Sequence, residues 1–462
     1  MSSQPILRAA AAGLLVAVAL ASTTRNRHLA AQQQTQTANP YQNPTPAQDT
    51  VIRDLVGRLA LDKYKATVKG LTMFGDRRQG TDRNRAAIDW IEAQLKSYGC
   101  SNTERLKYEF TRRQLQTDST RRVDSLAAVA AGQPYPPVGR AGGGGGARGR
   151  GAGAAGAAGA AGAGRGGGGG GGGRGGRGGN PPKGFTAPTG VNTNPMNQPD
   201  TALRRLNMQP DTPGPREEVY CTKIGRSIPQ EMYIIGAHMD GHGFGAAAND
   251  DGSGTALVME LARVFNSPDV QTERSIRFIL FNNEETGGGA AAYASQRAPM
   301  QGKEDPPGSG KYPEPKWLGM VQHDMMMWDH GMPGPDGKLS PEQRREADVN
   351  IEFGGDATFA AEASQLAFFF RRMNDRYATD YPAAVGDRMS NTDSQSFRNL
   401  VAAISLRENE RLAHTGTGWN PTWHQPIDVF ETFSDKDFRL GLNAAQTTLS
   451  AIAHLTGASI RR

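Results

Sequence analysis

The sequence predicts an α/β fold, with helices on both faces of a mostly parallel, mixed β-sheet in a three-layer α/β/α arrangement. One observation is the apolar run 232–237, which ends in polar residues and is followed by a helix, 254–265, with one apolar side. Another is that short apolar strands and helical patterns alternate along much of the chain. A third is that acids and histidines gather directly after predicted strands, where α/β proteins place their sites.

The first part of the chain is predicted to be mainly helical. Apolar side chains at helical spacing run from residue 49 to about residue 71. A second helix follows Thr81-Asp82, a good N-cap pair, and ends at Gly99. A strand at 104–110 completes this part.

The second half alternates strands with helices. Besides 232–237, strands are predicted at residues 218–223, 274–281, 318–322 and 401–406. Besides 254–265, helices are predicted at residues 288–297, 357–373 and 435–455. Two loops rich in Pro and Gly are predicted at residues 299–316 and 329–348.

The composition changes sharply between these two parts. Residues 140–179 hold 24 of the 59 glycines of the chain and six arginines, but no acid. Because the net charge is +6, the remaining residues sum to zero, which excludes a generally basic surface on the folded part. Such a segment cannot bury enough apolar area to offset the entropy of ordering it. We therefore predict a flexible, solvated insertion at 111–200 and no nucleic-acid partner.

The N-terminus has the pattern of an export signal. Arg8 precedes an apolar stretch, 9–18, and Ala19-Leu20-Ala21 is an A-x-A cleavage site. Residues 1–21 are predicted to be a signal peptide, followed by a disordered leader at 22–47. This predicts a periplasmic or secreted protein. No later stretch is long and apolar enough to span a bilayer, so no membrane association is expected after cleavage.

The chain has two cysteines, Cys100 and Cys221. In an oxidising compartment they could form a disulfide, and two free buried thiols fit the sequence equally well. Two cysteines are too few for a zinc site made of thiolates. Any metal would therefore need other ligands.

Acids and histidines follow several predicted strands, and one more group lies in a loop before the last helix. They are His238, Asp240, Asp250, Glu284, Glu285, Asp324, His424 and Asp428. Taken singly, each has a structural explanation, because an Asp after a strand is often an N-cap and carboxylates favour helix starts. Together, at strand ends, they predict a metal site at the C-terminal edge of the sheet. Imidazole and carboxylate ligands together suit zinc.

Five ordered motifs relate the chain to a known family. They are G-A-H-M-D (236–240), N-D-D-G-S-G (249–254), N-E-E-T-G (283–287), Q-H-D-M (322–325) and W-H-Q-P-I-D (423–428). With them the chain resembles the zinc-dependent exopeptidases typified by bacterial leucyl aminopeptidases, which also include glutamate carboxypeptidases and, more remotely, glutaminyl cyclases. The resemblance implies an N-terminal part of the peptidase domain at 48–110 and a main zinc peptidase domain at 201–462.

The resemblance also implies a role for each site residue. It implies two zinc ions per chain, bridged by Asp250. One ion would be completed by His238 and Asp324, and the other by Glu285 and His424. Glu284 would be the general base, Asp240 would orient His238, and Asp428 would orient His424.

Other assignments stay open in the sequence. Asp251 could bridge in place of Asp250, although the offset from Ser253-Gly254 favours Asp250. His414 could be the last ligand, but it lacks the H-x-x-x-D context of His424. His242 and His330 are near the site in sequence, whereas His323 should face away from it and His454 should pack inside the last helix. Trp419 and Trp423 fit a substrate pocket or plain packing equally well.

These observations predict an exported di-zinc metallopeptidase, an aminopeptidase acting on a peptide substrate. The alternatives are a carboxypeptidase of the same family, a single-zinc acyltransferase of the glutaminyl cyclase type, and a catalytically silent binding protein that uses the Gly/Arg tract. The sequence does not predict an oligomeric state.

Overall fold

The computed structural model describes residues 39–110, 191–212, 214–330, 348–389, 392–408 and 420–461. The predicted signal peptide, most of the predicted leader and most of the predicted insertion lie outside these residues. Residues Thr45–Arg462 form one compact unit. Among the described residues, no helix is long and apolar enough to cross a membrane.

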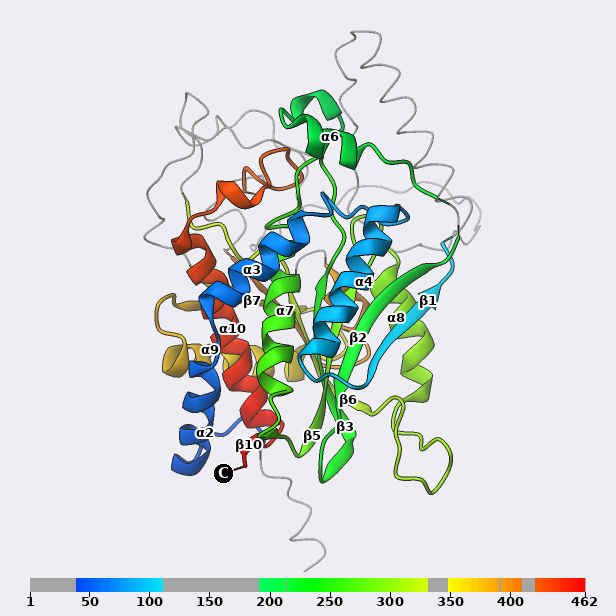
Figure 1. Ribbon diagram of the computed structural model, residues 1–462. Coiled ribbons are helices and arrows are strands. Elements are labelled where there is room, and N and C mark those ends of the chain that lie inside the picture. The colour runs from blue at the N-terminus through cyan, green and yellow to red at the C-terminus, as the bar shows by residue number, and fades with distance from the viewer. Residues whose placement is uncertain are drawn as a thin grey trace, which may run out of the picture. The chain divides into compact units, whose positions relative to one another are not determined.

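A mixed eight-stranded sheet forms the middle layer (Figure 1). Its strands are β1 (Thr103–Tyr108), β2 (Arg216–Lys223), β3 (Ile228–His238), β5 (Arg274–Phe281), β6 (Lys316–His323), β7 (Val349–Phe353), β8 (Ala383–Gly386) and β9 (Ala403–Arg407). They follow the order β1-β2-β5-β3-β6-β9-β7-β8. The central strands β5, β3, β6 and β9 are parallel, whereas β1, β2 and β7 join by antiparallel pairing. The predicted α/β fold with a mixed sheet is confirmed.

Helices cover both faces of this sheet. They are α2 (Pro46–Gly57), α3 (Leu61–Thr72), α4 (Asp82–Ser97), α6 (Thr201–Asn207), α7 (Gly252–Phe265), α8 (Gly289–Arg297), α9 (Ala360–Tyr377) and α10 (Asp435–Leu455). Figure 1 shows α3, α4, α7 and α10 in front of the sheet and α8 behind it. Helix α7 packs on β3 and against α3 and α10, and nearly all of its residues are buried. On the other face, Ala290, Tyr293 and Ala294 of α8 pack on apolar residues of the central strands.

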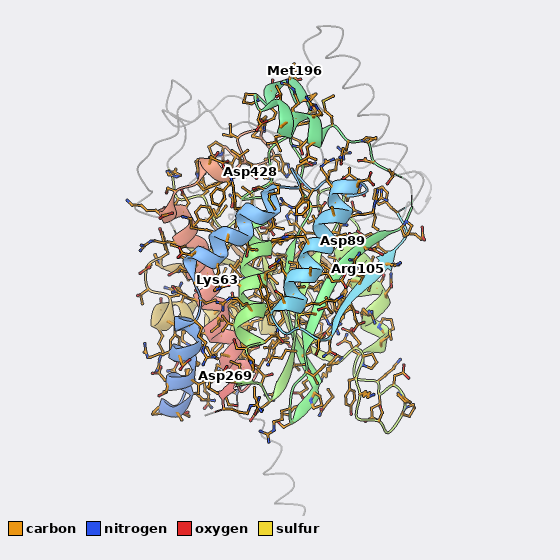
Figure 2. The ribbon with its side chains drawn as sticks, viewed as in Figure 1. Lys63, Asp89, Arg105, Met196, Asp269 and Asp428 are labelled. Atoms are coloured by element: carbon orange, nitrogen blue, oxygen red, sulfur yellow. A yellow bond between two sulfur atoms is a disulfide. The ribbon has the colours of Figure 1, made fainter. Side chains whose placement is uncertain are left out.

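An ion pair and a disulfide connect helix α4 and the residue after it to the sheet. Thr81 caps α4, because its hydroxyl accepts the N–H of Asn84, as its sequence predicts. Arg105 on β1 forms an ion pair with Asp89 on α4 at 2.6 Å, and both are labelled in Figure 2. A disulfide joins Cys100, after α4, to Cys221 on β2. The two cysteines that the sequence left as paired or free are therefore paired.

The sheet topology determines where a site can form. Helix α7 leads from β3 towards β5 on one side of β3, and β6 pairs with β3 on the other side. The chain thus continues to opposite sides of β3, and such a switch in strand order leaves a crevice at the carboxyl ends of the strands. The loop residue Asp428 lies towards this end of the molecule and Asp269 at the opposite end (Figure 2).

Candidate metal centre

The end of β3 provides the first donor of the candidate metal centre. His238 is the last residue of β3 and is fully buried. Its Nδ1 lies 2.9 Å from the backbone carbonyl of Asp240, and donation to that carbonyl leaves Nε2 as the metal-binding nitrogen. The predicted partner was the Asp240 carboxylate, but this lies 3.9 Å from Nδ1. The backbone carbonyl orients the ring instead, because the chain turns directly after the strand.

Asp250 lies between two imidazoles. Its Oδ1 is 3.3 Å from Nε2 of His238, and its Oδ2 is 2.9 Å from Nε2 of His424. One oxygen of Asp250 therefore faces the donor group around His238, and the other oxygen faces the donor group around His424, as a bridging ligand requires. The adjacent Asp251 caps α7, and its carboxylate accepts the backbone N–H groups of Gly254, Met325 and His238. The structure thus places Asp250, and not Asp251, between the two groups.

Asp324 completes the first donor group. It follows β6 directly, and its Oδ1 lies 3.8 Å from Nε2 of His238. Its Oδ2 forms an ion pair at 2.6 Å with Arg407, the buried last residue of β9. The arginine holds one oxygen of Asp324, so that the other oxygen faces the group. The ligand atoms of His238, Asp250 and Asp324 all lie within 4.8 Å of one another.

A second group lies on the other side of Asp250. Nε2 of His424 is 2.8 Å from Oε2 of Glu285, which follows β5. His242, from the loop after β3, also reaches this group, and its Nε2 lies 3.0 Å from the same glutamate oxygen. The ligand atoms of His242, Glu285 and His424 lie within 4.8 Å of one another. Two adjacent donor groups therefore meet at Asp250.

Glu284 precedes the Glu285 ligand and is held separately. Its backbone N–H donates to Oδ1 of Asp240 at 3.1 Å. Burial, together with the nearby charge of Glu285, raises the pKa of Glu284 well above its ordinary value, although His238 opposes the shift. A carboxylate with a raised pKa, half-buried beside the donor groups, is suited to accept and return a proton.

The charges of the two groups favour a bound cation. Burial opposes ionisation of Asp250, but His238 and His424 outweigh it and hold its pKa below the usual range. Burial likewise raises the pKa of Glu285, yet His242 and His424 bring it down to about 2. Conversely, burial lowers the pKa of His424, and Glu285 with Asp250 raises it to about 10. These carboxylates are therefore ionised, and either charged imidazoles or a bound cation can balance their negative charge.

The donors fit zinc. Among the described residues, neither Nε2 of His238 nor Oε1 of Glu285 has a hydrogen-bond partner, although both atoms are buried. Buried polar atoms without partners are costly, and a metal ion satisfies such atoms. The two groups supply imidazole nitrogens and carboxylate oxygens with no thiolate, which is a ligand set that zinc accepts.

Neither donor group includes Asp428, Trp423 or the described histidines His323, His330 and His454. Asp428 does not orient His424, because its carboxylate accepts the N–H groups of Asn249 and Asp250 at 2.8 and 3.1 Å. Trp423 stacks on the His424 ring, with centroids 4.0 Å apart. Other histidines are away from the donors: His323 bonds to Thr448, His330 to Asp437, and His454 packs on Phe369. His414 and Trp419 lie outside the described residues.

Three residues near the centre had no role in the sequence prediction. His242 is only a neighbour of the site in sequence, and no role is predicted from the sequence for Arg407 or Arg77. Arg77 is fully buried and donates to the carbonyls of Met239, Ala246 and Ala247, which fixes the loop after β3. A histidine five residues after the end of the predicted strand 232–237 is a detectable signal. The two arginines carry none, because their partners are distant in sequence.

The fold and these donors define a protein of the metallohydrolase class, with its centre at the carboxyl end of the sheet. Residues 220–447 match the sequence profile described as Peptidase family M28. The chain thus carries a metallopeptidase domain of Peptidase family M28. This match covers all the donor residues, and it confirms the resemblance found from the motifs.

Similar proteins agree with this family. Aminopeptidase YwaD of Bacillus subtilis (strain 168) is 46% identical over 59 residues, which are 13% of this chain and 12% of that protein. Carboxypeptidase Q of Xenopus laevis is 31% identical over 71 residues, 15% of each chain. The alignments thus span well under a fifth of either relative. The solved structure of BSAP, a zinc aminopeptidase from Bacillus subtilis, has the same fold, with a TM-score of 0.50 and 14% identity over 86% of this chain and 95% of that one.

Proposed function

We propose that this chain is an exported di-zinc aminopeptidase. The observation that carries the proposal is the position of Asp250, whose two oxygens face His238 and His424 in two adjacent donor groups. A single-metal site does not need a carboxylate placed in this way, whereas paired zinc ions about 3.5–4 Å apart do. The names of the similar proteins, a zinc aminopeptidase and aminopeptidase YwaD, support the choice of metal and reaction.

The residues of the chain have distinct roles in peptide hydrolysis. His238, Asp250 and Asp324 would hold one zinc ion, and Glu285 and His424 would hold the other together with Asp250. Zinc in these positions would polarise the peptide carbonyl and lower the pKa of the attacking water towards neutrality. Glu284 would take the proton from that water and pass it to the leaving amine. The Asp240 carboxylate would keep Glu284 in place by accepting the backbone N–H of Glu284.

Metal content and substrate choice test this proposal together. The mature protein, purified without chelators, is expected to contain about two zinc ions per chain. It should release the first residue from peptides with a free N-terminus and leave N-acetylated peptides intact. Cleavage of the N-acetylated peptides from their C-terminus would instead indicate a carboxypeptidase. One zinc ion, with cyclisation of N-terminal Gln and no cleavage, would indicate the cyclase alternative.

Export rests on separate support. The predicted signal peptide at 1–21 precedes a chain whose two cysteines form a disulfide, and disulfides persist in oxidising compartments. N-terminal sequencing of the protein from the periplasm or the medium is expected to start at Ser22. A cytosolic protein that retains Met1 would contradict export without affecting the proposed chemistry.

A further inference from the structure

His242 reaches the second donor group from the loop after β3. Its Nε2 lies 3.0 Å from Oε2 of Glu285 and 3.0 Å from Nδ1 of His424. The rings of the two histidines meet edge to face, with centroids 4.0 Å apart. The His242 side chain is 17% exposed, so it points mainly into the protein.

The loop carrying His242 is fixed against the chain at His424. Gly243 has a φ of +95°, and a Cβ at this position would lie 2.3 Å from the carbonyl oxygen of His424. This approach requires glycine. Asn192 joins the two segments, because its side-chain amide donates to the carbonyl of Gly243 and its backbone N–H donates to the carbonyl of His424, each at 3.0 Å. The position of His242 is therefore set by backbone contacts.

The Nε2 atom of His242 has two close polar neighbours, Oε2 of Glu285 and Nδ1 of His424. An imidazole nitrogen carries either one proton or one lone pair, so Nε2 cannot serve both Glu285 and His424 equally well. Two donors on a tetrahedral zinc ion lie about 3.3 Å apart, given zinc–ligand bonds of about 2.0–2.1 Å. Nε2 of His242 and Oε2 of Glu285 are close to this separation. A cation shared by the two residues would satisfy both atoms at once.

We propose that His242 is a ligand of the second zinc ion, and this rests on the proposed di-zinc function. The second site would then have two imidazoles, His242 and His424, and the carboxylates of Glu285 and Asp250. The first site would have one imidazole, His238, with Asp250 and Asp324. Both sites would have two carboxylates, but the second would have one imidazole more than the first, so the ion in the second site is bound more tightly.

Nitrogen NMR of the full mature chain, labelled with ¹⁵N-histidine, tests this directly. On addition of two equivalents of zinc, three imidazoles are expected to show a metal-bound nitrogen. His242→Gln should remove one of the three and leave two. A His454→Gln control, in a helix away from the donors, should leave all three. In a chelator competition, the zinc ion that the unmodified chain binds more tightly should be lost about tenfold more easily from His242→Gln.

Two outcomes would overturn the inference in different ways. If only two imidazoles bind zinc and the His242 nitrogens stay unbound in the unmodified chain, the second site lacks His242 while the di-zinc function stands. If no imidazole responds to zinc, the proposed function fails together with the inference. The count in the unmodified chain decides this even if His242→Gln does not fold.

Discussion

The backbone N–H of Glu284 donates to the carboxylate Oδ1 of Asp240 at 3.1 Å. This bond links the loop after β3 to the residue proposed as the general base. Asp240 also orients His238, but through its backbone carbonyl, which a side-chain substitution retains. The Asp240 carboxylate is therefore expected to position Glu284 rather than to hold a metal.

Substitution of Asp240 separates these two roles. Asp240→Ala is expected to lower kcat by about tenfold to a hundredfold with little change in zinc content, because the N–H of Glu284 loses its acceptor. Asp240→Asn keeps an acceptor oxygen and should retain much more activity. The measurement is kcat together with bound zinc for both variants. A large loss of zinc in Asp240→Ala would show that the carboxylate acts on the metal ligands.

Glu284→Gln tests the proposed base. Glutamine has nearly the same shape but cannot accept a proton, so kcat should fall by about 10²–10⁴-fold while two zinc ions stay bound. Because Glu284 must be ionised to act as a base, the unmodified enzyme should also lose activity as the pH falls through the pKa of this residue. Steady-state kinetics from pH 5 to 8, with zinc measured on the same samples, check both points. Full activity of Glu284→Gln is incompatible with the assigned role.

Glu218 provides a test of stability against pH. It is fully buried on β2, where burial and then the charge of Asp393 raise its pKa well above the ordinary value of 4.5. A carboxyl with a raised folded pKa binds more protons in the folded than in the unfolded chain. The stability from this group is complete below pH 4.5 and is lost as the pH rises, by at most about 1.4 kcal/mol per pH unit.

Glu218→Gln removes this dependence. The variant is expected to gain stability relative to the unmodified chain as the pH rises from 5 to 8, with little difference near pH 4.5. The free energy of unfolding from urea denaturation at several pH values is the measurement. Parallel curves for the two proteins would mean that Glu218 does not bind a proton on folding.

Three of the donors were predictable because they follow strands. The ends of β3, β5 and β6 were recognisable from apolar runs, and His238, Glu285 and Asp324 follow from them. Asp428 shows the limit of this reasoning. The family resemblance implies that Asp428 orients His424, but the chain turns so that the Asp428 carboxylate accepts the backbone N–H groups of Asn249 and Asp250. Contacts between distant segments have no periodic signal in a sequence.

The edge of the sheet shows a similar limit. Strands β7 and β8 were not predicted, and β8 is the short run Ala383–Gly386, which includes no branched residue except Val385. β7 pairs antiparallel with β9 and parallel with β8, so its stability comes from neighbours that are distant in sequence. The helical region before residue 72 was predicted as continuous, yet it forms α2 and α3 with a break at 58–60.

The disulfide between Cys100 and Cys221 gives the last prediction. It joins the segment after α4 to β2 across 121 residues of sequence, so it restricts the unfolded chain strongly. The double variant Cys100→Ala/Cys221→Ala is expected to lower the free energy of unfolding by about 2–4 kcal/mol. Its kcat/KM below the unfolding transition should be unchanged, because all the donor residues belong to other segments. Urea denaturation and steady-state kinetics measure the two effects, and a loss of zinc from the double variant would show that the bridge also supports the metal centre.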